Sequence, residues 1–157
     1  MYDDISKKIH DIMVCQGKTL ATAESCTSGR ISAMLTSIDG ASEYFLGGII
    51  AYQNEIKIER LGVSASDIQK YDVVSKQVAE QMVRGACAFF QSDYAIASTG
   101  YTGRGTAQIP SGTIWIAWGN ETEQHSTCLT ENLGREKNTQ NATETALTEF
   151  YGLIHNA

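Results

Sequence analysis

A polar turn with one central serine is the first place in this sequence where chemistry could occur. Residues 19–30 read TLATAESCTSGR, so a short apolar run leads into hydroxyl and small side chains around Ser25. This order predicts a strand, a tight turn and a helix, and the free amides of the first helical turn would face a ligand beyond the strand end. Ser25 could present a nucleophilic oxygen there. The alternative is an ordinary helix cap formed by Thr27 or Ser28.

Lys57 is the candidate base for such a nucleophile. It lies between two isoleucines near the start of a short helix predicted at 53–62. Asn54 would cap this helix and Gly62 would end it. The helix dipole and partial burial would both lower the pKa of an amine at this position, so that it could accept a proton near neutral pH. The alternative is a surface lysine whose stem covers apolar neighbours.

Cysteine and histidine residues give no sign of a metal site. The four cysteines include no C-x-x-C pair and the three histidines are equally dispersed, so no metal-ligand spacing occurs and no cofactor is expected. Cys26 adjoins the polar turn, where a thiol nucleophile is an alternative to the serine. Because it has no obvious histidine partner, we rank it below Ser25.

A second polar loop follows an apolar run at 94–98. It reads TGYTGRGT over residues 99–106, and three glycines with three threonines after a strand indicate a loop that wraps an anion or a polar ligand. The glycine spacing matches neither a Walker phosphate loop nor a dinucleotide fingerprint. Thr99 and Gly100 are therefore candidate ligand contacts.

The segments that must position these residues alternate between strand and helix. Apolar residues at helical spacing predict helices at 2–16, 30–38, 75–90 and 136–154. Apolar runs predict strands at 20–24, 44–52, 94–98, 113–118 and 124–129, of which 44–52 should be covered on both faces. The expected fold is α/β: a three-layer α/β/α sandwich with a mixed β-sheet, as a single domain over residues 1–157. Ligands of such open sheets lie beyond the carboxyl ends of strands, and the loops at Ser25, Tyr52 and Thr99 all follow predicted strands.

Charge and hydropathy exclude several classes of partner. The chain has 157 residues, 12 basic and 18 acidic, with a net charge of -6 and no run of lysine or arginine, so binding to nucleic acid or to an anionic membrane is not expected. The N-terminus lacks the apolar core of a signal peptide and no apolar run would span a bilayer, which predicts a cytoplasmic protein. Aromatic residues could form contacts in a homo-oligomer, although we favour core positions for them: Tyr44, Phe45, Trp115 and Trp118.

Five motifs in order resemble the CinA carboxy-terminal domain family. They are ATAESCTSG, FLGGIIAYQNEIKIERLGV, VVSKQVAEQMVRGA, STGYTG and PSGTIWIAW, and they lie within residues 20–146, nearly the whole chain. Many CinA proteins also carry an amino-terminal domain. The 157 residues show no motif of that domain, so the stand-alone form of the family is expected.

The resemblance implies a small-molecule nucleotide substrate and no metal. The expected reaction is hydrolysis of the carboxamide of nicotinamide mononucleotide to nicotinate mononucleotide and ammonia, in pyridine-nucleotide salvage. The resemblance also implies Ser25 as nucleophile, Lys57 as base and Tyr52 as a group that relays a proton or holds the pair in place. Amide hydrolysis needs these groups together with donors for the oxyanion. The backbone amides expected as donors belong to Cys26, Thr27, Ser28 and Gly29.

Three segments depart from the usual family pattern. Ser28 stands where the family has the first glycine of S-C-T-G-G, and residues 100–104 read GYTGR where G-I-A-G-P is usual. Before the last helix the family has two arginines four residues apart, whereas here Arg135 is followed by Thr139. Arg135 would bind a phosphate group, and Arg104 would assist unless it is merely solvent-exposed. Two alternatives therefore stay open: a family member that binds or senses a pyridine nucleotide without hydrolysing it, and an amidase acting on another small amide.

Overall fold

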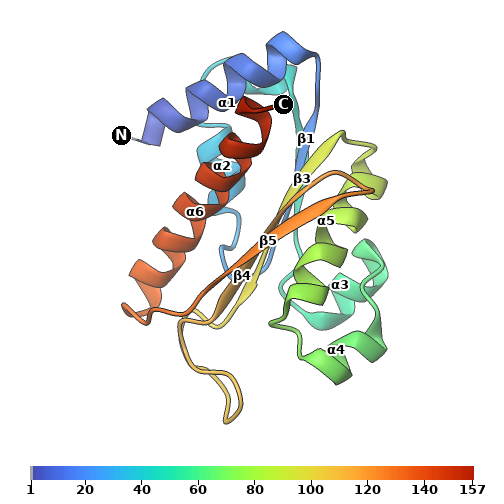
Figure 1. Ribbon diagram of the computed structural model, residues 1–157, viewed down its shortest axis with the longest axis vertical. Helices are drawn as coiled ribbons and strands as arrows, with labels where there is room; N and C mark the ends of the chain where they lie inside the picture. Colours follow the sequence, from blue (N-terminus) through green and yellow to red (C-terminus); the bar gives the residue numbers. More distant parts are fainter. Residues whose placement is uncertain (1) are drawn as a thin grey trace.

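A five-stranded mixed sheet forms the centre of the molecule (Figure 1). The computed structural model describes residues 2–157. The strands are β1 (Leu20–Glu24), β2 (Phe45–Ile50), β3 (Tyr94–Gly100), β4 (Ile114–Gly119) and β5 (Gln124–Leu129). They lie in the order β2-β1-β3-β4-β5. β1 runs parallel to both β2 and β3, whereas β4 is antiparallel to both β3 and β5.

Helices cover both faces of the sheet and confirm the three-layer α/β/α prediction (Figure 1). On one face lie α1 (Tyr2–Gln16), α2 (Arg30–Leu35) and α6 (Arg135–His155), which share one buried apolar cluster with the sheet. On the other face lie α3 (Asn54–Leu61), α4 (Ala65–Tyr71) and α5 (Lys76–Phe90), with a second cluster. The short 3-10 helix η1 (Ala41–Glu43) precedes β2. No helix in the described part of the chain is long and apolar enough to cross a bilayer.

Local sequence signals set several helix ends. At the start of α5 the Ser75 side chain accepts a hydrogen bond from the Val78 amide, as expected of an N-cap serine. Gly62 ends α3 in the left-handed conformation, with a φ of 66°. Several predicted ends differ: α2 ends at Leu35 rather than at residue 38, β2 spans Phe45–Ile50 rather than 44–52, and β3 continues to Gly100 rather than ending at residue 98.

β2 is an edge strand, since it pairs only with β1. The expected cover on both of its faces is wrong, because the side chains of Leu46 and Ile50 are 47% and 55% exposed. Gly48 in this strand serves close packing. A Cβ at Gly48 would collide with the hydroxyl groups of Thr22 and Ser32, so its absence lets α2 lie against the sheet.

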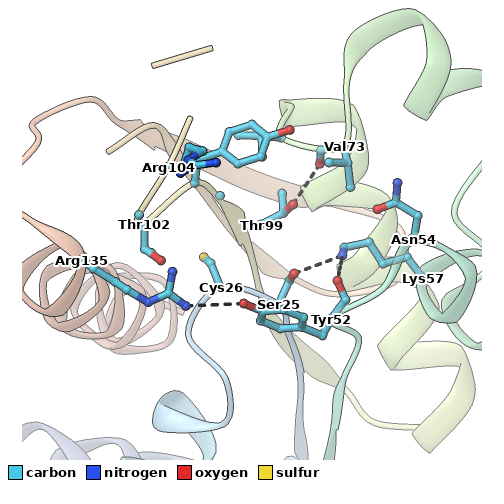
Figure 2. A pocket seen from close by; sticks show the side chains of 14 residues that line it. Ser25, Cys26, Tyr52, Asn54, Lys57, Val73, Thr99, Thr102, Arg104 and Arg135 are labelled. Atoms are coloured by element: carbon cyan, nitrogen blue, oxygen red, sulfur yellow. Dashed lines mark hydrogen bonds between the residues drawn. The ribbon is translucent and has the colours of Figure 1, made fainter. Parts of the chain in front are cut away.

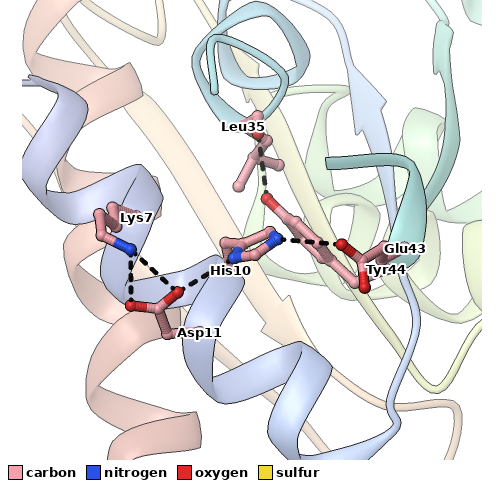
Figure 3. Close-up of polar contacts among 6 residues, drawn as sticks. All are labelled: Lys7, His10, Asp11, Leu35, Glu43 and Tyr44. Atoms are coloured by element: carbon pink, nitrogen blue, oxygen red, sulfur yellow. Dashed lines mark hydrogen bonds and ion pairs between the residues drawn. The ribbon is translucent and has the colours of Figure 1, made fainter. Parts of the chain in front are cut away.

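A cluster at the amino ends of β1 and β2 joins α1 to the segment before β2 (Figure 3). The fully buried Tyr44 donates a hydrogen bond from its hydroxyl to the Leu35 carbonyl at 3.1 Å. The His10 ring meets the Tyr44 ring edge-on with 5.8 Å between centroids, and His10 Nε2 lies 3.8 Å from Glu43 Oε1. Tyr44 is thus a core residue, as is Trp118 with 8% exposure, which confirms the favoured interpretation for these two residues. Phe45 and Trp115 are only partly buried and pack against the two apolar clusters.

Candidate active site

The parallel strands β1, β2 and β3 end at the same edge of the sheet, and a pocket of about 270 Å³ lies beyond their carboxyl ends (Figure 2). Its walls come from the turn after β1, the segment from β2 into α3, the α4–α5 connection, the β3–β4 loop and the first turn of α6. Ser25, Tyr52 and Thr99, which the sequence placed after three strands, all line this pocket.

Ser25 and Lys57 form a hydrogen-bonded pair inside the pocket. Lys57 Nζ lies 3.0 Å from Ser25 Oγ and donates to the Tyr52 carbonyl at 3.2 Å. The lysine is 1% exposed and the serine 8% exposed, so the alternative of a surface lysine over apolar neighbours is wrong. Figure 2 shows the two side chains pointing toward one another, one from the turn after β1 and the other from α3.

Burial lowers the pKa of Lys57 to about 8 from an ordinary value of 10.5, because the ammonium group loses its hydration. The neighbouring Cys26 opposes this shift to a smaller extent. About half of the amine is therefore neutral near pH 8. In that state Nζ can donate to the Tyr52 carbonyl and accept the proton of Ser25.

The turn that carries Ser25 is held by a buried carboxylate that was not singled out from the sequence. Glu24 is 1% exposed, and its oxygens accept hydrogen bonds from the Ile31 and Ser32 amides at 2.9 and 3.0 Å. It also accepts from the Thr27 hydroxyl at 2.6 Å. Glu24 therefore satisfies the first amides of α2 and closes the turn around Ser25. The available signal was an acidic residue at the end of an apolar strand, directly before a helix.

The helix cap considered for Thr27 or Ser28 is wrong. The cap position of α2 is Gly29, which has a φ of 94° and no side chain that could cap the helix. The Thr27 hydroxyl is buried between Glu24 and Ser98, at 2.6 and 2.7 Å. Ser28 has a φ of 53°, in the left-handed region that glycine adopts most readily. None of these three turn residues lines the pocket, so their side chains are not placed to contact a ligand there.

Cys26 does line the pocket, but its thiol is not poised for attack. The residue is 8% exposed, and burial raises the pKa of the thiol to about 12. The thiol therefore stays protonated under physiological conditions, and the thiolate is the reactive form of cysteine. This favours Ser25 over Cys26 as the nucleophile. In the described residues, no group of three or more His, Cys, Asp or Glu side chains could hold a metal ion.

The remaining candidate ligand contacts reach the pocket from the β3–β4 loop and from α6. Thr99, Gly100, Arg104 and Arg135 all line it. The Thr99 hydroxyl donates to the Val73 carbonyl at 2.9 Å, so this threonine also holds the α4–α5 connection against the end of β3. Figure 2 shows Arg135 reaching in from α6, on the side of the pocket opposite Lys57.

The charged side chains that line the pocket are all cationic. They are Lys57, Arg104 and Arg135, and no carboxylate lines the pocket although the chain has a net charge of -6. Arg135 Nη2 lies 3.5 Å from the Tyr52 hydroxyl, at the long limit of a hydrogen bond. Thr139 turns its hydroxyl back to the Arg135 carbonyl at 2.8 Å and stays outside the pocket lining. The charge of the pocket therefore favours an anionic ligand.

Several lining residues were missed or given another role by the sequence. Asn54, expected as the N-cap of α3, is instead the first residue of that helix and lines the pocket, while Gln53 holds the cap position. Tyr101, Thr102 and Gly103 line the pocket beside Arg104. The glycine-rich composition of this loop signalled a ligand contact, but it could not show which residues face inward.

Comparisons with known proteins identify the family of this chain. The model of the family described as the CinA C-terminal domain matches residues 2–154. A CinA-like protein of Picosynechococcus is 46% identical over 112 residues, which is 70% of this chain and 27% of that protein. A CinA-like protein of Flavobacterium psychrophilum is 40% identical over 135 residues, 85% of this chain and 32% of that protein. The chain thus spans about a third or less of the length of these curated relatives.

Solved structures match over nearly the whole chain. The competence/damage inducible protein CihA from Agrobacterium tumefaciens superimposes with a TM-score of 0.92 at 29% identity, covering 97% of this chain and 94% of that chain. The competence damage-inducible protein A from Klebsiella pneumoniae gives a TM-score of 0.92 at 26% identity, covering 96% and 95%. With a family match over almost all residues and the same fold, this chain belongs to the CinA C-terminal domain family.

Proposed function

We propose that this protein is an amidohydrolase that converts nicotinamide mononucleotide to nicotinate mononucleotide and ammonia. The observation that carries the proposal is the buried Lys57 amine, 3.0 Å from Ser25 Oγ, in a pocket whose charged lining is entirely cationic. A serine beside an amine of lowered pKa is an activated nucleophile that needs no histidine. The resemblance to nicotinamide-nucleotide amidohydrolases supplies the substrate.

The first half of the reaction forms an acyl-enzyme. Neutral Lys57 takes the proton of Ser25 as Oγ attacks the carboxamide carbon, and the resulting ammonium then gives that proton to the departing ammonia. Of the four amides expected as oxyanion donors, that of Ser28 already bonds to the Ser25 carbonyl at 3.1 Å. Thr27, Ser28 and Gly29 lie outside the pocket lining, whereas Cys26 lines it. We therefore assign oxyanion binding to the Cys26 amide.

The second half releases the product. Water takes the place of ammonia, Lys57 accepts its proton, and the hydroxide attacks the acyl carbon of the ester on Ser25. As the tetrahedral intermediate collapses, Lys57 returns its proton to Ser25 Oγ and the product leaves as the carboxylic acid, which loses its own proton to solvent or to the released ammonia and becomes the carboxylate of nicotinate mononucleotide. The Tyr52 carbonyl, 3.2 Å from Lys57 Nζ, keeps the amine aimed at Ser25 through both halves. This assigns to Tyr52 the role of holding the pair in place.

The arginines account for the phosphate of the substrate. Arg104 and Arg135 line the same pocket as the Ser25–Lys57 pair, and an arginine binds phosphate through two parallel N–H donors. Thr139 offers no charge in place of the usual second arginine of the family, so Arg104 takes over that part of the binding. A phosphorylated amide would then reach the nucleophile with its anionic end held on the other side of the pocket.

The test is ammonia release from nicotinamide mononucleotide by the purified native chain, with Ser25→Ala and an exposed control, Ser37→Ala. We expect turnover by the native chain and the control, and a loss of at least about a thousandfold in Ser25→Ala. Unchanged turnover in Ser25→Ala would remove the nucleophile assignment. Saturable binding of the nucleotide without turnover by the native chain would favour a nucleotide-binding member. Equal kcat/KM for nicotinamide riboside would favour an amidase that ignores the phosphate.

A further inference from the structure

We propose that Asn138 is a positioning residue that joins the β3–β4 loop to the start of α6, so that Arg104 and Arg135 act together on the anionic group of the substrate. This inference rests on the proposed function for the identity of the substrate. Asn138 is the fourth residue of α6, is 2% exposed and does not line the pocket. It would therefore act through other groups and not by touching the ligand.

The Asn138 carboxamide bonds to three different groups. Its Nδ2 donates to the Thr102 carbonyl at 2.9 Å and to Asn132 Oδ1 at 3.0 Å. Its Oδ1 accepts from the Leu133 amide at 2.8 Å. Both amide hydrogens and the carbonyl oxygen are thus in use. One side chain links a loop residue to a helix start that lies more than thirty residues later in the sequence.

The position of Asn138 in the helix explains why it can make these bonds. Side chains on a helix lean toward its N-terminus, so a residue in the second turn covers the first turn and the segment before it. Asn132 Oδ1 also accepts from the Gly134 amide at 3.2 Å. Gly134 has a φ of 89° and a ψ of 156°, a conformation open essentially to glycine alone. The segment before Arg135 is therefore held by two asparagine side chains: Asn138 binds the Leu133 amide and Asn132 binds the Gly134 amide.

The other end of the link bears directly on the arginines. Thr102 and Gly103 line the pocket between Gly100 and Arg104. A Cβ at Gly103 would lie 2.8 Å from Arg135 Nη1, so the guanidinium rests against the backbone of this loop. Because Asn138 holds the Thr102 carbonyl, it fixes the surface on which Arg135 lies and the point from which Arg104 extends. Loss of the link would let the two cations separate without moving Ser25 or Lys57.

The experiment compares the native chain with Asn138→Asp, Asn138→Ala and the control Asn141→Asp. The aspartate keeps the size and the acceptor for Leu133 but replaces the donor to Thr102, while the alanine separates the effect of added charge from that of the lost link. Asn141→Asp adds the same charge one turn away from the link, on the same helix. For each we would measure KM and kcat with nicotinamide mononucleotide and with nicotinamide riboside, which has no phosphate.

We expect both Asn138 variants to raise KM for the mononucleotide at least tenfold while kcat changes less than threefold and kcat/KM for the riboside stays unchanged. An equal loss on both substrates, or a fall in kcat alone, would overturn the inference, because an ordinary structural asparagine would act that way. If the native chain hydrolyses neither substrate, the proposed function fails, and calorimetric binding of inorganic phosphate decides the inference separately. At least tenfold weaker binding in both Asn138 variants, but not in Asn141→Asp, would support it; equal or absent binding would refute it.

Discussion

Replacing Lys57 by methionine should abolish turnover and also remove a pH-dependent cost to folding. Methionine has a similar length and no charge, so it keeps much of the buried volume. The variant loses the hydrogen bonds to Ser25 and to the Tyr52 carbonyl, and that loss is the same at every pH. The part of the stability that varies with pH therefore reports the buried amine alone.

The size of this effect follows from the pKa of the amine. It titrates at 10.5 when unperturbed and at about 8 in the folded protein. Between these values the unfolded chain binds more protons than the native state, so the free energy of unfolding of the native chain rises with pH through this window. The buried lysine costs about 3 kcal/mol at pH 7, about 2 kcal/mol at pH 9 and about 1 kcal/mol at pH 10. The methionine variant has no amine to titrate and so lacks this pH-dependent cost.

Urea denaturation at pH 7, 8, 9 and 10 would measure this cost as a free energy of unfolding, for the native chain, Lys57→Met and the exposed control Lys137→Met. The free energy of unfolding of the native chain relative to Lys57→Met should rise by about 2 kcal/mol from pH 7 to pH 10, with no such trend for Lys137→Met. In parallel, kcat/KM of the native chain should rise about tenfold per pH unit below about 8 and then level off. Parallel stability profiles, or a rate that keeps rising to pH 10, would refute the argument.

The remaining predictions concern the support of the site. Glu24→Gln should lower the free energy of unfolding by about 2 to 4 kcal/mol, because the new NH₂ group would face N–H and O–H donors whose hydrogen bonds the carboxylate now accepts. A loss under about 0.5 kcal/mol in chemical denaturation would contradict this. Cys26 should resist iodoacetamide in the native protein, since burial raises the pKa of its thiol to about 12, whereas the exposed Cys15 should be alkylated, as peptide mass mapping would report. Gly134→Ala should cost about 1 to 3 kcal/mol through backbone strain, while Gly152→Ala, within α6 and with open space around it, should be neutral or stabilising by up to about 1 kcal/mol; equal effects in thermal unfolding would speak against the strain.

The closeness of Ser25 and Lys57 could be predicted because the signals for it are local. Ser25 follows an apolar run and precedes a helical pattern, and Lys57 follows the next apolar run by a few residues. Since parallel strands that are neighbours end at the same edge, two such segments converge without further information. The distance of 3.0 Å between the two side chains could not be predicted, because it depends on how α3 packs against the ends of β1 and β2.

The supporting residues could not be predicted because their partners are set by packing. Glu24 reads as a polar residue at a strand end, and only the position of α2 reveals that its carboxylate is fully bonded. Asn138 reads as one of several polar residues in a helix, and its bond to Thr102 spans distant parts of the chain. The edge position of β2 was hidden for another reason. An apolar run that contains two glycines looks alike in a central strand and in an edge strand whose glycines admit a neighbouring helix.

The Ser25–Lys57 half of the pocket and its arginine half are held mainly by different parts of the fold. Ser25 and Lys57 are held by Glu24 and by the ends of β1 and β2, whereas the two arginines are held by the β3–β4 loop and α6. Arg135 Nη2 meets the Tyr52 hydroxyl only at the long distance of 3.5 Å, whereas Lys57 bonds to the Tyr52 carbonyl, so the anion-binding half can change with little effect on proton transfer. Under the proposed function, a chain with an altered glycine loop and Thr139 in place of an arginine can therefore keep the hydrolytic chemistry of Ser25 and Lys57. Substitutions in that loop should change which amide binds while leaving the pH dependence set by Lys57 intact.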